Sequence, residues 1–258
     1  MTTVADILKY VETLAPTYMK MDWDNVGLLC GSRETPVTKV LVALDPFEAV
    51  EWGAELIVTH HPIIFDPLKS VTEETTVGRS IMTLCRHGIS AVNAHTNLDC
   101  APGGVNDVLA ATLGLNDVET IPPFFRDDQG RQWGLLRRGR VEEQPLSQFL
   151  EIVKSSLNAE GLRYVDGGKP VRVVAVGGGH CSDELMSAFE AGCDTFVTAD
   201  IKYNEFWDAQ ALGMNLIDAG HFATENPVVA VLAEKIAAAF PEVQVKISET
   251  HRDCMKFY

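Results

Sequence analysis

The sequence predicts an α/β protein built from two similar lobes, and three observations support this class. Apolar strand segments alternate with helical segments, which is typical of parallel βαβ units. The same order of glycine, apolar strand and polar loop occurs twice along the chain. The chain has 258 residues, 46% of them apolar, which is enough for one large domain or two smaller lobes with a core.

The first half of the chain alternates between the two kinds of element. In chain order, the predicted elements are a helix at 3–14, a short strand within 23–31, a strand at 39–46, a helix at 47–54, a strand at 55–62, a helix at 75–87, a strand at 89–99 that runs into a loop, and a helix at 105–113. Thr3 and Asp6 have the spacing of a capping box at the start of the first helix. Gly88 ends the helix at 75–87.

The composition changes near residue 121. The segment that follows contains Pro122, Pro123, the polar turn DDQGR and the charged strand WGLLRRGR, and a helix is predicted at 146–159. The alternation of strands and helices then resumes and ends in a helix at 225–239. We therefore predict one lobe at about 1–121 plus 225–258 and a second lobe at about 122–224.

The second half repeats the order of the first. VRVVAVGGG (171–179) parallels KVLVALD, AFEAGCDTFVTADIK (188–202) parallels AVEWGAELIVTHHPI (49–63), and GMNLIDAGH (213–221) parallels GISAVNAHT (88–96). Any two βα units share a glycine after the helix and Val or Ile in the strand. Two consecutive units that match in order favour an internal repeat, and hence two related lobes.

Composition excludes several classes of function. The formal net charge of −15 does not favour a surface that follows a phosphate backbone, so nucleic acid is an unlikely partner. The one dense basic cluster, Arg137, Arg138 and Arg140, is interpreted as a solvated strand end. None of the six cysteines forms a C-x-x-C pair, and no stretch approaches 18 apolar residues. Together with an N-terminal segment unlike a signal peptide, this predicts a cytoplasmic protein with no membrane span.

Side chains that bind divalent metals follow the predicted strands in both halves: His60, His61, His95, Asp99, His221 and Glu225. Ligands of parallel α/β sheets collect at the carboxyl ends of strands, so these side chains are expected at one edge of each sheet. Thr224 is interpreted as an N-cap, which would make Glu225 the first residue of the helix at 225–239.

Imidazoles and carboxylates together form a mixed nitrogen and oxygen set that suits Zn, Mn, Fe, Co or Ni without choosing among them. Their number exceeds what one catalytic zinc needs and suits two metals. Adjacent His60 and His61 would point to opposite sides of an extended chain and reach different metals. Each signal also has a simpler reading. A histidine at a strand end is often a hydrogen-bonded core residue, and Asp99 could be an N-cap. Gly177–Gly179 could cradle a phosphate, although a tight turn fits its spacing better.

Five motifs make the sequence resemble a known family. WDNVGLLCG, VTHHPIIF, NAHTNLDCAPGGVND, ADIKYNE and DAGHFATE resemble the signatures of the GTP cyclohydrolase I type 2 homologue family, the Nif-three-like dinuclear-metal hexameric proteins, and they cover nearly the whole chain. The resemblance implies two α/β lobes, a metal site between them at strand carboxyl ends, two divalent metal ions per subunit, and a toroidal homohexamer built as a trimer of dimers. It places the metal ligands on His60, His61, Asp99, His221 and Glu225, and it makes His95 a residue beside the metals or in the cavity.

The resemblance implies a metal-dependent hydrolase acting on a nucleotide or related small molecule, in the manner of a GTP cyclohydrolase type 2. The alternative is a non-enzymatic metal-binding ring that binds protein partners. The candidates for proton transfer are His95, Asp200 and metal-bound hydroxide itself, and the sequence does not rank them. Lys202 and the Gly177–Gly179 turn are the local candidates for holding phosphate. Many relatives carry a histidine where this chain has Asn204, which weakens any acid or base role for that stretch.

Overall fold

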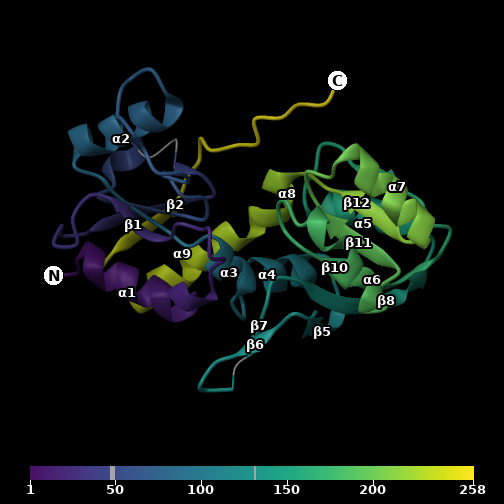
Figure 1. Ribbon diagram of the computed structural model, residues 1–258. Helices are drawn as coiled ribbons and strands as arrows, with labels where there is room; N and C mark the ends of the chain where they lie inside the picture. Colours follow the sequence, from purple (N-terminus) through teal and green to yellow (C-terminus); the bar gives the residue numbers. More distant parts are fainter. Residues whose placement is uncertain (47–49, 131) are drawn as a thin grey trace. The chain divides into compact units, whose positions relative to one another are not determined.

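A computed structural model describes residues 1–46, 50–130 and 132–258, which form two compact units. Unit 1 contains Met1–Ala101 and Val229–Arg252, and unit 2 contains Pro102–Val228 and Asp253–Tyr258. Each unit combines a β-sheet with helices (Figure 1), so the predicted α/β class is confirmed. Helix α9 (Pro227–Ala239) contains the boundary between the two units.

Unit 1 is built on a five-stranded sheet in the order β1-β4-β3-β2-β13. Its elements are α1 (Val4–Leu14), η1 (Thr17–Met19), β1 (Gly27–Cys30), β2 (Lys39–Ala43), η3 (Glu51–Gly53), β3 (Leu56–Thr59), α2 (Thr76–His87), β4 (Ser90–Asn93), α3 (Thr96–Cys100) and β13 (Gln244–Ile247). Strands β13, β2, β3 and β4 are parallel, and β1 is antiparallel to β4. The central strands β3 and β4 are buried along their whole length, as expected for strands covered on both faces.

Local capping signals in unit 1 form as predicted. Thr3 accepts from the Asp6 amide while the Asp6 carboxylate accepts from the Thr3 amide, which completes the capping box of α1. Helix α2 ends at Gly88, whose φ of 66° is the left-handed conformation that glycine adopts without strain. The helix predicted at 47–54 is only partly testable, because 47–49 lie outside the described residues. Glu51–Gly53 form one turn of 3₁₀ helix instead of an α-helix.

Unit 2 is built on a six-stranded sheet in the order β5-β8-β10-β11-β12-β9. Its elements are α4 (Val105–Thr112), β5 (Asn116–Thr120), β6 (Phe125–Arg126), β7 (Gln132–Trp133), β8 (Arg137–Gln144), α5 (Leu146–Ser156), β9 (Arg163–Val165), β10 (Val171–Val176), η4 (Ser182–Glu184), α6 (Leu185–Glu190), β11 (Thr195–Thr198), α7 (Tyr203–Leu212), β12 (Asn215–Asp218) and α8 (His221–Glu225). Strands β10, β11 and β12 are parallel, and the outer pairs are antiparallel. The short β6–β7 hairpin extends away from this sheet (Figure 1).

The repeat seen in the sequence corresponds to a shared arrangement of strands. In unit 1 the parallel strands β2, β3 and β4 are neighbours in that order, and in unit 2 the parallel strands β10, β11 and β12 are neighbours in the same order. In each unit an antiparallel strand follows the third one, β1 beside β4 and β9 beside β12. The two units therefore share three parallel strands in the same order, followed by an antiparallel strand, as the order of motifs predicts.

Among residues 1–46, 50–130 and 132–258, no helix has the length and apolarity that crossing a bilayer requires.

Candidate metal centre

Three histidines of unit 1 gather at the carboxyl ends of two adjacent strands. His60 and His61 follow β3, and His95 precedes α3 two residues after β4. Because β3 and β4 are parallel neighbours, their ends meet at the same edge of the sheet. The ring centroids are 5.0 to 5.7 Å apart, and one ligand atom from each ring lies within 4.8 Å of those of the other two. This group of side chains could hold a metal ion.

The three imidazoles of this group are held through the same ring nitrogen. The Nδ1 contacts are His60 with the Ala94 carbonyl at 2.9 Å, His61 with Asp45 Oδ1 at 2.8 Å, and His95 with Asp24 Oδ1 at 2.7 Å. A carbonyl or carboxylate oxygen only accepts, so each Nδ1 carries the proton and donates it. In the neutral ring Nε2 is then left as the electron-pair donor, which is the arrangement that metal-binding histidines adopt.

The two anchoring carboxylates are ionised over the neutral pH range. Burial acts to raise the pKa of Asp24, but hydrogen bonds from His95 and Thr96 outweigh it and lower that pKa to about 2. For Asp45, burial is again outweighed, here by hydrogen bonds from His251 and His61, and its pKa lies well below the ordinary value. Sequence reasoning did not give Asp24 or Asp45 a role. The available signal was the position of each residue in the sequence: Asp24 lies in WDN, and Asp45 ends the strand KVLVALD. Both segments are near strands that end in histidine.

Asp99 adds a carboxylate to the same group. It lies in the helix α3 and is buried, and its Oδ1 is 3.5 Å from His60 Nε2. The alternative interpretation of Asp99 as an N-cap for the following turn is wrong, because Asp99 lies inside α3 and the next helix, α4, has Gly104 as its N-cap. Unit 1 thus brings together three of the predicted ligands, His60, His61 and Asp99, and it places His95 beside them.

Unit 2 brings together the other two predicted ligands. His221 and Glu225 begin and end the short helix α8, one turn apart, and His221 Nε2 is 3.0 Å from Glu225 Oε2. The Nδ1 of His221 is 2.7 Å from Asp200 Oδ2, so this ring is anchored as those of unit 1 are. Glu225 is buried, with 4% of its side chain exposed. Asp200, a candidate for proton transfer from the sequence, has the role of holding His221.

The prediction that Glu225 opens the helix at 225–239 is wrong. Glu225 is the last residue of α8, and α9 begins at Pro227. Gly220, with a φ of 87°, is the N-cap residue of α8 and starts that helix directly after β12. The Thr224 hydroxyl donates to carbonyl oxygens one turn earlier and accepts from the Gly179 amide, so it has no capping role.

The Gly177–Gly179 turn supports Glu225 and has no amides free for a phosphate. The Gly178 amide donates to Asn106 Oδ1 at 2.7 Å, and the Gly179 amide donates to Thr224 Oγ1 at 3.0 Å. A Cβ at Gly179 would lie 2.1 Å from Glu225 Oε1, so only glycine permits this approach. The segment lies outside the helices and strands and bends at Gly179, whose φ is 60°.

The cationic candidates of unit 2 are paired with carboxylates. Lys202 Nζ lies 3.0 Å from Asp183 Oδ1 and 3.4 Å from Glu205 Oε1. The interpretation of the arginine cluster as a solvated strand end is wrong for Arg137, which is buried and donates to Asp107 at 2.6 Å.

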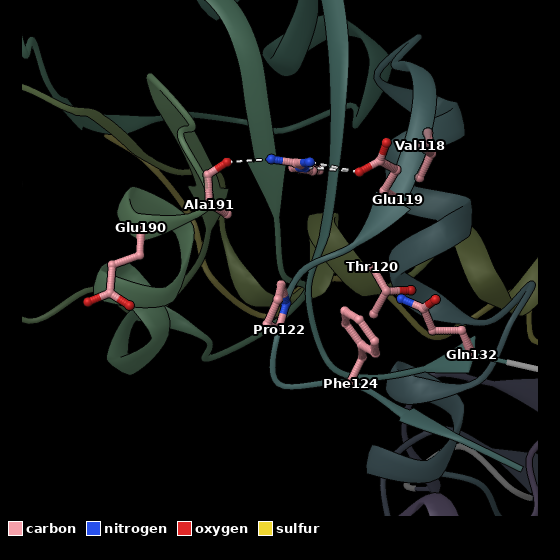
Figure 2. Close-up of a pocket in the computed structure, with 9 residues that line it drawn as sticks. Val118, Glu119, Thr120, Pro122, Phe124, Gln132, Glu190 and Ala191 are labelled. Carbon is pink, nitrogen blue, oxygen red and sulfur yellow. Dashed lines mark hydrogen bonds and ion pairs between the residues drawn. The ribbon is translucent and has the colours of Figure 1, made fainter.

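Arg138 lines a pocket of about 600 Å³ in unit 2, where its guanidinium donates to Glu119 and to the Ala191 carbonyl (Figure 2). The described residues that line this pocket, among them Thr120, Pro122 and Phe124, include none of the predicted metal ligands. The guanidinium of Arg138 is therefore already hydrogen-bonded to protein groups in this pocket.

Comparisons with known proteins identify the class to which this fold and this set of donors belong. The sequence pattern of the family described as Duf34/NIF3 (NGG1p interacting factor 3) matches residues 2–254. A protein of Clostridium perfringens named GTP cyclohydrolase 1 type 2 homolog is 35% identical over 262 residues, which cover 98% of each chain. A protein of the same name from Halalkalibacterium halodurans is 43% identical over 83% of this chain and 87% of its own.

Solved structures agree with this assignment. The Bacillus cereus protein related to NIF3 superposes with a TM-score of 0.91 at 26% identity and covers 100% of this chain and 99% of its own. HcgD of Methanocaldococcus jannaschii, solved in a reduced form, superposes with a TM-score of 0.79 at 26% identity over 97% of this chain and 98% of its own. The chain belongs to the Duf34/NIF3 family, which confirms the resemblance found in its motifs.

Proposed function

We propose that the protein binds two divalent metal ions through His60, His61, Asp99, His221 and Glu225 and acts as a metal-dependent hydrolase. The observation that carries this proposal is the common state of the imidazoles. In both units a protein oxygen accepts from Nδ1, which directs Nε2 toward the other donors. The proposal requires the ligands of unit 1 and those of unit 2 to serve one centre between the two lobes.

The donor set fits such a centre. Neutral imidazole and carboxylate are the ligands of Zn, Mn, Fe, Co and Ni, and the set does not select one of these. A pair of divalent cations supplies Lewis-acid polarisation of a carbonyl or phosphoryl group and makes water acidic enough to attack near neutral pH. Asp24, Asp45 and Asp200 fix the tautomer of the rings that they contact. His95, anchored but outside the proposed ligand set, is placed to exchange a proton with a bound molecule.

We propose a nucleotide or a related small molecule as the substrate. The relatives' name, GTP cyclohydrolase 1 type 2 homolog, supports this class. The two segments expected to hold phosphate do not add to it, because the amides of Gly178 and Gly179 and the ammonium of Lys202 are engaged within the protein. Recognition therefore depends on the metals and on the part of the substrate that is not phosphate.

Metal analysis of the purified protein tests the centre. We expect two divalent ions per chain in the wild type, and loss of at least one in His61→Ala and in Glu225→Gln. His87→Ala is the matched control, since His87 is an exposed histidine of α2 bonded to the Thr83 carbonyl. A wild type with less than one ion per chain, or equal metal content in all variants, would refute the proposal. Nucleotides and phosphoesters are then screened for turnover with each metal restored.

The second candidate is a metal-binding ring that binds protein partners without catalysis. The family's description as an interacting factor favours it. If this candidate is correct, the Glu225→Gln variant still binds the protein partner and no substrate is turned over. If the protein is a hydrolase, the same variant loses turnover while its oligomeric assembly persists. For both candidates we propose a cytoplasmic protein that forms a homohexamer, a trimer of dimers. Light scattering of the purified protein tests the hexamer.

A further inference from the structure

Two large aromatic side chains of unit 1 are exposed next to each other. Trp23 is 62% exposed and Phe65 is 52% exposed, and their ring centroids lie 5.7 Å apart at an interplanar angle of 50°. Aromatic residues of this size normally bury about 150–250 Å² each and dominate the energetics of cores and interfaces. A pair of them left in solvent indicates a surface that another molecule covers.

The exposure of this pair does not come from a loose loop. Trp23 precedes Asp24, whose side chain is fully buried and accepts from the amide and hydroxyl of Thr96 as well as from His95. The side-chain amide of Asn25 donates to the Ile64 carbonyl at 2.7 Å, which ties the segment of Trp23 to the segment of Phe65. The two rings are thus presented by backbone that is held in place before any ligand arrives, which reduces the entropy lost on binding.

The aromatic pair also borders the imidazole group. The His95 ring lies edge-on to both, with centroids 6.2 Å from Trp23 and 6.1 Å from Phe65. On its other side His95 is 5.2 Å from His60 and 5.7 Å from His61. A molecule resting on the aromatic pair therefore lies one imidazole away from the predicted metal ligands.

We propose that Trp23 and Phe65 form a stacking platform for a planar heteroaromatic ring of purine size. Tilted aromatic rings offer both a face and an edge, and heteroaromatic rings pair with either. Stacking on Trp and Phe accepts every nucleobase, because each base has a π-face. Asp22 and Asp66, the exposed chain neighbours of the two aromatics, carry negative charge in both segments, which disfavours an anionic ring. A role for this bound ring in a reaction rests on the proposed function, whereas the binding of the ring to Trp23 and Phe65 does not.

Ligand-observed NMR titration with inosine and with adenosine tests the platform on the full-length protein, as purified and after removal of metal with EDTA. We expect both nucleosides to bind in both preparations and D-ribose not to bind. Trp23→Ala and Phe65→Ala should each weaken nucleoside affinity about tenfold, the range found when one stacking ring is removed. Trp23→Phe, which keeps an aromatic face, should retain most of the affinity. Trp207→Ala is the matched control, because Trp207 is 58% exposed on α7 of unit 2.

The outcomes separate this inference from the proposed function. Nucleoside binding that survives in metal-poor His61→Ala, together with full metal content in Trp23→Ala, supports the platform. The inference is overturned if neither nucleoside binds at millimolar concentration, or if Trp23→Ala binds as tightly as the wild type. It is equally overturned if Trp23→Ala lowers the oligomeric state while nucleoside binding is unchanged, since the pair would then be a subunit contact. A wild type that binds metal and no nucleoside leaves the metal centre intact and removes only the platform.

Discussion

Replacing Gly179 with alanine probes how closely the backbone approaches Glu225. Gly179 has a φ of 60°, and an added Cβ would lie 2.1 Å from Glu225 Oε1 and 3.0 Å from His221 Nε2. Ordinary van der Waals contact begins near 3.4 Å, so the carboxylate would have to retreat by about 1.3 Å. Because Glu225 is buried, it has little room for this movement. A binding constellation tolerates displacements of only about 0.5 Å, so the proposed metal site should suffer more than the fold.

Gly114→Ala is the control that isolates this contact. Gly114 is also in unit 2 and has a φ of 71°, but no atom lies within 4 Å of the position that an added Cβ would take. Both variants therefore carry the strain of a left-handed alanine, about 1–2 kcal/mol of unfolding free energy. Only Gly179→Ala should also lower metal affinity, by about 10–100-fold, the effect of disturbing residues that position ligands.

The assay combines urea unfolding with competition against a fluorescent metal chelator. We expect a larger loss of unfolding free energy in Gly179→Ala than in Gly114→Ala, because only the first adds a clash with buried Glu225, and a loss of metal affinity in Gly179→Ala alone. Equal metal affinity in Gly179→Ala, Gly114→Ala and the wild type would refute the reasoning, because Glu225 would then either move without consequence or not bind metal.

Two further predictions concern stability. The pKa of Asp24 is about 2 in the folded protein against an ordinary 3.8, so its interactions stabilise the fold above pH 4 and this contribution, about 1–2 kcal/mol, is lost as the pH falls toward 2. Urea unfolding across this range should show that loss in the wild type and not in Asp24→Asn; an unchanged pH dependence in the variant would contradict the assignment. Arg137→Ala should cost about 2–3 kcal/mol of unfolding free energy, because it removes the buried partner with which Asp107 makes charge-assisted hydrogen bonds. Arg138→Ala, which removes a pair with the exposed Glu119, should cost less than about 1 kcal/mol, and equal losses in the two would show that burial does not decide the difference.

Features that depend on neighbouring residues could be predicted from the sequence. The capping box of Thr3 and Asp6 joins residues three apart, and Gly88 ends α2 through its own backbone conformation. The parallel strands of both units follow from runs of Val and Ile that repeat at similar intervals. These signals require no knowledge of how the chain returns on itself.

Features that depend on distant residues could not be predicted in the same way. The contact of Asp24 with His95 joins residues 71 apart, and that of Asp45 with His61 joins residues 16 apart. Neither spacing forms a local pattern. The assignment of Glu225 to the wrong helix has a similar origin, because the Thr224 hydroxyl is engaged by the distant Gly179 amide. That contact removed the capping role which the local sequence favoured.

The repeat explains why ligands and their anchors occupy matching positions. Thr59 at the end of β3 corresponds to Thr198 at the end of β11, so two residues later His61 corresponds to Asp200. In unit 1 this position supplies an imidazole, and in unit 2 it supplies the carboxylate that accepts from Nδ1 of His221. One loop of the shared strand arrangement therefore carries a predicted ligand in one unit and the residue that orients a predicted ligand in the other.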